Sequence, residues 1–421
     1  MKKLIIALSL IFTGLTASAL TPREELAADP NKTGAVYFAY PQTDADNTPA
    51  PKGFKPFHFS HYGRHGSRYL IGDNDYRWIA DLLHKADREN ALTAEGRDLM
   101  TRLDSLMVET AGRGGDLSPL GRRQHRGIAE RAYRNYPEIF ADNSRITARS
   151  TLVPRCILSM ASFTERLKEQ NPRLVIDMES SNRYMPYLCH STRESDEFNS
   201  DRGWWNEVYR KFEREKVDGS RIVGEIFNNK QFAERYVDPD KFLWGVYWLA
   251  SDAQNTEGLI DFYKFLTPDE LLGMYECFNA RFYAQHANYA PAEGKHLKNA
   301  DNLLTNIIET ADAAIAESNP SAALRFGHDG NVVPLVARMH IAGCDTVIAD
   351  QHDFYKGWNS WQVTPMGANI QIVFYRNPKQ PDRILAKVLH NEREVRINGV
   401  KTDIWPYYDW ADLRQFWLRD M

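Results

Sequence analysis

The sequence of 421 residues predicts an α/β fold whose sheet-forming part is interrupted by a mainly helical region. Strand-like segments followed by helix-like segments occur near both ends of the chain, at residues 57–167 and 322–339. Between them, from about residue 190 to 310, long amphipathic and aromatic segments are typical of helices. Chains that alternate strands and helices build layered α/β domains.

The composition is that of a globular protein with enough apolar residues for a large core: 43% are hydrophobic and 26% charged. The 52 basic and 56 acidic residues give a net charge of −4. This balance gives no reason to expect nucleic acid or an anionic membrane as a partner. A bound anion would have to be held by a local cluster of basic side chains.

The first 19 residues have the layout of a cleavable signal peptide: two lysines, a short apolar run and a small-residue cleavage site at Ala19. The apolar run is too short to span a bilayer comfortably, and no later segment is apolar enough to do so. We therefore expect a periplasmic or secreted protein. Residues 20–56, which are polar and interrupted by Pro, Asn and Asp, are predicted to form an extended lead-in.

The first part of the α/β core is predicted at residues 57–189, with strands at 57–61, 145–148 and 174–178. Three helices are expected there. One has its apolar face between Leu99 and Met107, the next is capped by Ser118, and the last begins near residues 150–151.

The helical insertion is predicted at residues 190–310 and the second part of the core at 311–421. The insertion includes a capping box at residues 267–270, and a further helix is expected at residues 299–318. The helical spacing of Trp244, Tyr247 and Trp248 favours a core face over a ligand platform. Strands are predicted at residues 322–327, 369–376, 384–389 and 395–400.

The four cysteines (Cys156, Cys189, Cys277 and Cys344) are widely and irregularly spaced, without a metal-ligand pattern. An exported protein can form disulfides, so bridges and buried free thiols both remain open. No zinc site is predicted.

Residues 64–68 (Arg-His-Gly-Ser-Arg) place one imidazole between two guanidinium groups directly after a predicted strand. Guanidinium groups bind phosphate oxygens in a bidentate manner, and nearby positive charge lowers the pKa of a histidine. A neutral His65 in this setting is a candidate nucleophile toward phosphorus. Gly66 would let a ligand approach the backbone closely. A solvated basic turn is the alternative.

Two further segments carry candidate groups at the ends of predicted strands. His328 and Asp329 follow the strand at 322–327, and Asp329 could protonate a leaving alkoxide or simply cap the following helix. Residues 149–155 place Arg149 and Arg155 near a helix start. Ligands of open α/β sheets bind beyond the carboxyl ends of the strands, so these segments can converge.

Together these motifs resemble those of the histidine acid phosphatase family (histidine phosphatase superfamily, branch 2), which includes phytases and multiple inositol polyphosphate phosphatases. The family's Arg-His-Gly-x-Arg loop matches residues 64–68, and its Leu-Thr-x-x-Gly-x-x-Gln helix start matches 117–124. Its Arg-Ser-Thr-x-x-x-Arg motif matches residues 149–155, and its late His-Asp pair matches 328–329. The resemblance spans about residues 57 to 335.

The resemblance implies a three-layer α/β/α core and a phosphomonoesterase that works through a phosphohistidine, without a metal or other cofactor. His65 would be the nucleophile and Asp329 the general acid. The implied substrate is a small phosphorylated molecule of the inositol polyphosphate (phytate-like) kind. The implied phosphate-binding residues are Arg64, Arg68, Arg155 and His328.

Other readings of these motifs remain open. They are a broad-specificity acid phosphatase acting on sugar phosphates, a non-catalytic phosphate binder on the same fold, and a transferase like phosphoglycerate mutase. Outside the motifs, Arg122, Arg123 and Arg126 are predicted to form a solvated helix face, and a polyanionic substrate would favour a contact with one of them. Lys295, His296 and Lys298 are similar candidates, and His58 and His61 are predicted to be structural or supporting.

Overall fold

The computed structural model describes residues 20–41, 44–200, 202–317, 319–419 and 421. Within them, eight strands form one mixed sheet in the order β3-β2-β4-β1-β5-β6-β7, with β8 beside β6. The strands β1 to β4 run parallel, whereas β5 pairs antiparallel with β1 and β6 antiparallel with β5. The strands are β1 (Lys55–Arg64), β2 (Arg145–Ser150), β3 (Val175–Ser180), β4 (Ala322–Gly327), β5 (Asn369–Asn377), β6 (Gln380–His390), β7 (Arg393–Glu394) and β8 (Tyr407–Asp409).

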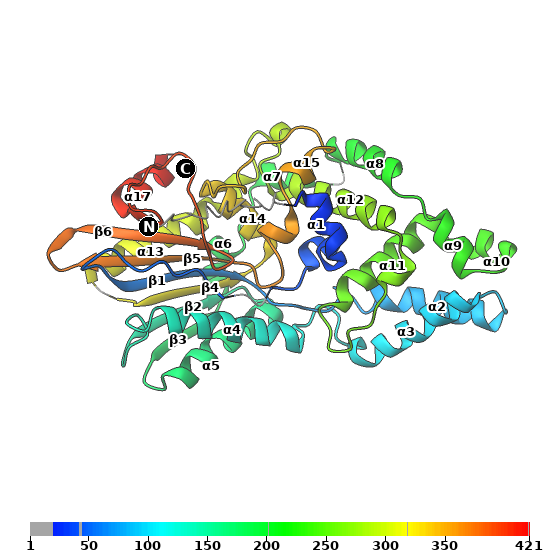
Figure 1. Cartoon of the computed structure of the whole chain (residues 1–421), viewed down its shortest axis with the longest axis horizontal. Coiled ribbons are helices and arrows are strands. Elements are labelled where there is room, and N and C mark those ends of the chain that lie inside the picture. The colour runs from blue at the N-terminus through cyan, green and yellow to red at the C-terminus, as the bar shows by residue number, and fades with distance from the viewer. Residues whose placement is uncertain (1–19, 42–43, 201, 318, 420) are drawn as a thin grey trace, which may run out of the picture.

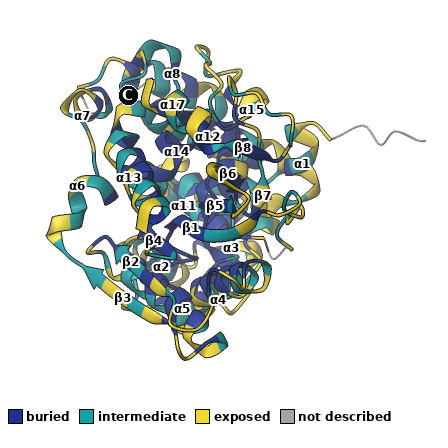
Figure 2. Cartoon of the chain, turned by 90° about the vertical axis from the view of Figure 1, so that its left-hand side faces the viewer, coloured by how far each residue is buried: buried dark blue, intermediate teal, exposed yellow. Residues whose placement is uncertain are grey.

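Helices cover both faces of this sheet (Figure 1), which confirms the expected three-layer α/β/α core. The helices α4 (Pro119–Asn135) and α5 (Pro154–Gln170) lie on one face, where α5 contacts β2 and β4. On the other face, α13 (Asp301–Glu317) and α14 (Asp329–Arg338) contact β1, and α17 (Trp410–Arg419) contacts β6. The central strands are buried on both faces and the edge strand β3 is largely accessible (Figure 2).

The predicted helix starts are confirmed by their caps. The Ser118 side chain accepts from the Gly121 amide at the start of α4, and Thr267 with Glu270 closes a reciprocal capping box. The helix α5 begins with Pro154 at its first turn, a few residues later than predicted, because residues 151–153 form the turn that leaves β2.

A second group of helices extends from the carboxyl ends of the strands, to the right in Figure 1. It includes α2 (Asn74–Arg88), which contacts α11 (Pro239–Ala253), and α3 (Ala94–Thr110), which contacts α9 (Ser220–Ile226). The sequence prediction places α2 and α3 in the first part of the core. Thr93 joins them to α9 because its amide donates to the Ile226 carbonyl at 3.0 Å. The exact domain boundaries remain a prediction. The other helices of this second group are α7 (Arg193–Asn199), α8 (Trp205–Lys216), α9 (Ser220–Ile226), α10 (Lys230–Tyr236), α11 (Pro239–Ala253), η3 (Tyr263–Phe265) and α12 (Pro268–His286).

Two predicted segments differ from the structure. The lead-in is not extended throughout, because a Thr21–Glu24 capping box starts α1 (Pro22–Ala28) and η1 (Pro30–Tyr37) follows it. Residues 395–400 are not a strand, because the Ile397 amide donates to the Tyr408 hydroxyl instead of continuing the β6 ladder. The remaining short helices are η2 (Asn182–Tyr184), α6 (Met185–Leu188), η4 (Ala290–Ala292), η5 (Leu297–Ala300), α15 (Phe354–Gly357) and α16 (Ser360–Val363).

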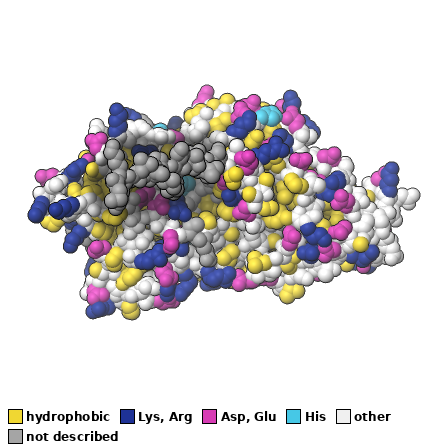
Figure 3. Space-filling view, viewed as in Figure 1, with side chains coloured by type: hydrophobic (Ala, Val, Ile, Leu, Met, Phe, Trp, Pro, Cys, Tyr) yellow, Lys and Arg dark blue, Asp and Glu magenta, His cyan; other side chains and the backbone are white. Residues whose placement is uncertain are grey.

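The predicted signal peptide at residues 1–19 lies outside the described residues. None of the described helices is both long enough and apolar enough to cross a membrane. All four cysteines are free thiols, of which Cys189 is exposed and the other three are buried. On the face shown in Figure 3, acidic and basic side chains are interspersed.

Candidate active site

Three segments leave the sheet side by side at its carboxyl edge. In the parallel register Arg64 at the end of β1 pairs with Gly327 of β4, and Ser150 of β2 pairs with Phe326. The chain continues from these strands into the predicted nucleophile loop, the His-Asp pair and the turn before α5. The structure therefore brings together segments that are more than 250 residues apart in the sequence, as the strand pattern predicts.

His65 is buried, with 2% of its surface exposed, and its orientation is set by its own loop. Its Nδ1 lies 2.9 Å from the Gly66 carbonyl oxygen, which can only accept a hydrogen bond. We therefore assign the proton to Nδ1, which leaves the Nε2 lone pair free. Burial, together with the charges of Arg64 and Arg68, holds the pKa of His65 well below its usual value. The imidazole is thus neutral and unprotonated at Nε2.

Arg64 is fully buried and held from both sides of its guanidinium group. Its Nη1 donates to the carbonyl oxygens of Val36 (2.6 Å) and Thr364 (2.7 Å), and its Nη2 lies 2.8 Å from Oδ2 of Asp329. Its Nε is buried and has no hydrogen-bond partner among the described residues. Burial lowers the pKa of Arg64 to about 10, which leaves it cationic at neutral pH.

Asp329 opens α14, with about a quarter of its side chain exposed. Burial alone would raise its pKa, but the charges of Arg64 and His328 outweigh it and hold the pKa at about 2. In the free protein Asp329 is therefore a carboxylate paired with Arg64. A general acid must carry a proton, so this role requires that a bound substrate changes the balance of charge.

His328 stands opposite His65, with ring centroids 5.8 Å apart and ring planes at 70°. Its Nε2 lies 3.2 Å from the Thr151 hydroxyl, and burial lowers its pKa to about 4. Arg155, in the first turn of α5, contributes to the lowered pKa of His65, and its own pKa is lowered by burial and by the charge of Arg68. His328 and Arg155 therefore belong to the same cluster as the nucleophile loop.

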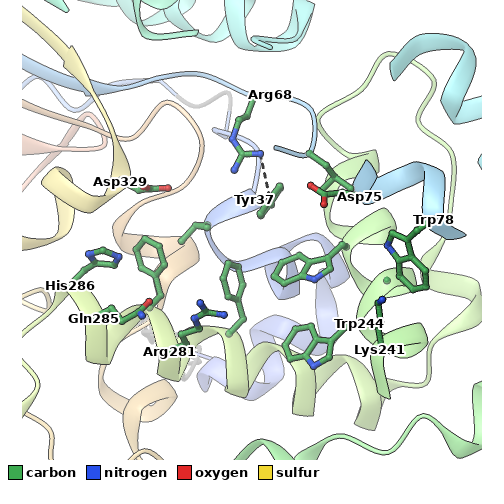
Figure 4. Close-up of a pocket in the computed structure, with 16 residues that line it drawn as sticks. Tyr37, Arg68, Asp75, Trp78, Lys241, Trp244, Arg281, Gln285, His286 and Asp329 are labelled. Carbon is green, nitrogen blue, oxygen red and sulfur yellow. Dashed lines mark hydrogen bonds between the residues drawn. The ribbon is translucent and has the colours of Figure 1, made fainter. Parts of the chain in front are cut away.

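Arg68 turns back toward the lead-in. Its Nη1 donates to the Tyr69 carbonyl (2.7 Å) and to the Tyr37 hydroxyl (3.2 Å), and its guanidinium carbon lies 4.6 Å from the Tyr37 ring centroid (Figure 4). Sequence reasoning missed Tyr37, because it belongs to a segment expected to be an extended lead-in. We call Arg64, Arg68 and Arg155 the basic cluster.

The helix α4 supports the nucleophile loop from behind. A Cβ atom on Gly66 would lie 2.5 Å from the Gly121 carbonyl oxygen, so Gly66 makes room for this helix. The close approach of a ligand to its backbone stays a prediction. Gln124 completes the support: its Oε1 accepts from the Ser67 amide at 2.8 Å, and its Nε2 donates to the Ser67 hydroxyl at 2.9 Å. The motif at residues 117–124 thus holds the loop in place.

Comparison with known proteins now decides the family. Residues 63–396, which make up most of the chain, match the model of the histidine phosphatase superfamily (branch 2). The chain belongs to this superfamily. Membership of this superfamily supports a phosphatase activity for the chain. Comparison with curated proteins gives no match.

Solved structures share the fold of this histidine phosphatase at low sequence identity. A multiple inositol polyphosphate phosphatase from Bifidobacterium longum, solved with inositol hexasulfate, has a TM-score of 0.76 at 18% identity, covering 91% of this chain and 97% of that one. The phytase from D. castellii has a TM-score of 0.64 at 14% identity, covering 93% and 85%. A Hafnia alvei phytase in complex with myo-inositol hexakis sulphate has a TM-score of 0.53 at 12% identity, covering 88% and 98%.

A cavity of about 540 Å³ opens beside the basic cluster of this phosphatase (Figure 4). Arg68 and Asp329 line one side, and aromatic side chains of α2, α11 and α12 line the other. Tyr247 is buried in the core, as the stripe predicts, whereas the half-buried Trp244 and Trp248 pack against that core and also line the cavity. The lining residues are Val36, Tyr37, Arg68, Leu70, Asp75, Trp78, Lys241, Trp244, Gly245, Trp248, Phe278, Arg281, Phe282, Gln285, His286 and Asp329.

Several other basic candidates lie apart from this cavity. Arg149 pairs with Asp177, whereas Arg123 and Arg126 form ion pairs with Glu257 and Glu169, each at 2.7 Å. These pairs support the prediction of a solvated helix face. The side chains of His58, His61 and His296 are buried, and His296 hydrogen-bonds the Ser195 hydroxyl. Lys295 pairs with Glu293 at 3.1 Å, and Lys298 does not line the cavity.

No group of three or more His, Cys, Asp or Glu side chains within the described ranges is arranged to hold a metal ion. The charges of all three members of the basic cluster act on His65. The expectation that the reaction needs no metal stays a prediction.

Proposed function

We propose that this chain is an exported histidine-type phosphomonoesterase that hydrolyses organic phosphate esters, with inositol polyphosphates as its substrates. The observation that carries the proposal is the tautomer of His65. Because Nδ1 donates to the Gly66 carbonyl, the Nε2 lone pair is free inside a cluster of guanidinium groups. Such an imidazole is suited to attack a phosphorus atom whose oxygens are held by positive charge.

In the first step Nε2 of His65 attacks phosphorus, the bond from phosphorus to the leaving oxygen breaks, and Asp329 donates a proton to that oxygen. A phosphohistidine and an alcohol result. Asp329 is ionised in the free protein because it faces Arg64 at 2.8 Å. A phosphate group bound at Arg64 brings negative charge next to Asp329, which raises its pKa and permits it to carry the proton.

In the second step water attacks the phosphohistidine and Asp329 takes a proton from it. Inorganic phosphate leaves and His65 is regenerated. The basic cluster and His328 bind the oxygens of the phosphoryl group that is transferred. This binding stabilises the negative charge of both transition states.

The substrate class is supported by the structural neighbours, since the Bifidobacterium longum enzyme was solved with inositol hexasulfate. The cavity favours a second candidate, a phosphatase acting on sugar phosphates, because aromatic side chains form much of its lining. Export is supported by the signal-peptide pattern of residues 1–19.

A phosphate-release assay of His65→Ala tests the proposal. Mature protein should release phosphate from phytate, a sugar phosphate or an aryl phosphate, and His65→Ala should reduce kcat by at least about 1,000-fold because the covalent step is lost. His84→Ala is the matched control, since His84 is an exposed histidine of α2 that pairs with Asp104 at 2.9 Å. Substantial turnover by His65→Ala would refute the phosphohistidine route, and an inactive wild type that binds phosphate would indicate a binding protein.

A further inference from the structure

We propose that the cavity binds the leaving group of the substrate by the flat, apolar face of a ring, and that this ring carries only one or two further anionic groups. The proposal rests on the proposed phosphatase function and names the substrate class of the same site. Two features of the lining carry it: a continuous set of aromatic side chains and a small number of unpaired cations. We call Trp78, Trp244, Trp248, Phe278 and Phe282 the aromatic wall.

The aromatic wall is connected to the basic cluster by direct ring contacts. Arg68 lies over Tyr37, whose ring centroid is 5.7 Å from that of Trp248. Trp248 in turn stacks on Trp244 with centroids 5.4 Å apart and planes at 19°, and meets Phe278 edge-on at 4.8 Å. A phosphate group held at Arg68 therefore places the atoms attached to it against the aromatic wall.

All five side chains of the aromatic wall are only partly buried, although aromatic side chains of this size stabilise a fold most when they are fully buried. Tyr247, one turn from Trp244 on α11, shows the contrast because it is completely buried. The aromatic wall supplies most of the apolar part of the cavity lining, and charged and polar side chains supply the rest. Concave sites that combine apolar and polar groups in this way are typical of ligand sites. The carbon–hydrogen face of a sugar or inositol ring, or the face of an aryl ring, fits such a surface.

The charges that line the cavity beyond the basic cluster are few. Lys241 and Arg281 are exposed and form no ion pair within the described part of the chain, and Asp75 contributes one opposing carboxylate. Lys241 lies 5.0 Å from the Trp78 ring centroid, at the end of the cavity remote from Asp329 (Figure 4). Because each phosphate ester carries about 1.5 to 2 negative charges at pH 7, these two cations can balance one further phosphate group or two singly charged groups, and not five phosphate groups.

The aromatic wall is tested by comparing kcat/KM for myo-inositol 1-phosphate with that for acyclic glycerol 2-phosphate. In Trp244→Ala the ratio of the two should fall about tenfold, because the ring loses a stacking surface that the acyclic ester does not use. Trp244→Phe should retain most of the ratio, since a ring remains. Trp204→Ala is the control, because Trp204 is 54% exposed and lies outside the cavity lining.

The charge limit is tested with fructose 1,6-bisphosphate and fructose 6-phosphate. Lys241→Gln combined with Arg281→Gln should lower kcat/KM at least fivefold more for the bisphosphate than for the monophosphate. Wild-type protein should also prefer an inositol bisphosphate, such as myo-inositol 1,4-bisphosphate, to inositol hexakisphosphate.

Each part of this proposal has an outcome that overturns it. An unchanged ratio in Trp244→Ala, or an equal loss in Trp244→Phe, overturns the aromatic wall as a ring-binding surface. A preference for hexakisphosphate, or equal effects of the double substitution on both fructose esters, overturns the charge limit. In all these cases esters are still hydrolysed, so the phosphatase function itself would stand. A wild type that hydrolyses none of them refutes the proposed function.

Discussion

In the proposed mechanism Asp329 serves two steps that need opposite protonation states. In the free protein its carboxylate is 2.8 Å from Arg64, and its pKa of about 2 keeps it ionised. As a base toward water in the second step, an ionised carboxylate is ready. As an acid in the first step, it must gain a proton when the substrate phosphate partly neutralises Arg64.

We expect Asp329→Asn to slow hydrolysis according to the leaving group. An alkyl phosphate, whose alkoxide is a poor leaving group, should lose about 100-fold or more in kcat, because general acid catalysis contributes about that much. An aryl phosphate with an acidic phenol needs little protonation and should lose far less in its phosphorylation step. Single-turnover rates for a series of esters measure this dependence. Equal slowing across the series would contradict the assigned role.

The pH dependence of kcat/KM should reflect His65. Burial and the neighbouring guanidinium groups lower its pKa well below 6.5, so activity should persist below pH 6.5. It should be lost only as His65 gains a proton at lower pH, since protonation removes the attacking lone pair. Arg155→Gln removes one of the charges that lower this pKa, so the acidic limb should move to higher pH.

The substrate for this experiment is an aryl phosphate with a good leaving group. Its hydrolysis needs little proton donation, so the protonation of Asp329 does not dominate the pH dependence of kcat/KM. Arg149→Gln is the matched control, because the Arg149 guanidinium pairs with Asp177 outside the site. Both variants use the same substrate, whose own titration therefore cancels in the comparison. An acidic limb that is identical in the two variants would show that Arg155 does not act on His65.

At the scale of elements, the site depends on how closely α4 packs against the loop after β1. Gly121 is the point of contact, since a Cβ atom there would lie 2.2 Å from the Ser67 carbonyl oxygen. The amide of Ser118 also donates to this oxygen at 2.9 Å, which fixes the start of the helix against the loop. The conformation of residues 64–68 is therefore imposed by a neighbouring element.

Gly121→Ala should lower the free energy of unfolding by about 2 kcal/mol and reduce activity, because the added methyl group must displace loop backbone. Gly224→Ala is the matched control within α9, where a Cβ atom would meet nothing within 4 Å. That variant should gain about 0.5–1 kcal/mol from the better helix former. Denaturant unfolding and phosphate release measure both effects. Equal stabilities for the two variants would contradict the packing argument.

At the scale of the whole molecule, three separate parts of the chain meet around the cavity. The α/β core supplies the basic cluster, the helical group supplies the aromatic wall, and the lead-in supplies Tyr37 between them. Asn255, which follows α11, ties these parts together, because it accepts from the Ser67 hydroxyl at 2.6 Å and donates to the Tyr37 carbonyl at 2.9 Å.

Tyr37→Phe should weaken inhibition by inorganic phosphate about fivefold, because Arg68 loses an acceptor worth about 1 kcal/mol that orients its guanidinium group. The ring contacts remain, so thermal stability should change little. Tyr133→Phe is the control, since Tyr133 packs on Phe140 away from the cavity. Unchanged phosphate inhibition in Tyr37→Phe would show that the lead-in does not position Arg68.

The sequence by itself determined the α/β layers, most helix starts and the segments that meet at the carboxyl edge of the sheet. These features follow from local patterns: alternation, caps, and charged groups directly after strands. It also indicated Arg64, His65, Arg68, Arg155, His328 and Asp329 as one cluster, which the strand register brings together.

Only the tertiary structure decided which surface each of these residues faces. Gly66 makes room for α4, Trp244 and Trp248 face a cavity, and Tyr37 reaches Arg68 from the lead-in. Helical spacing cannot distinguish an aromatic face that packs in a core from one that lines a cavity, because both need the same apolar stripe. The difference depends on whether distant segments fill the space in front of that stripe, and this is set by packing across the whole chain.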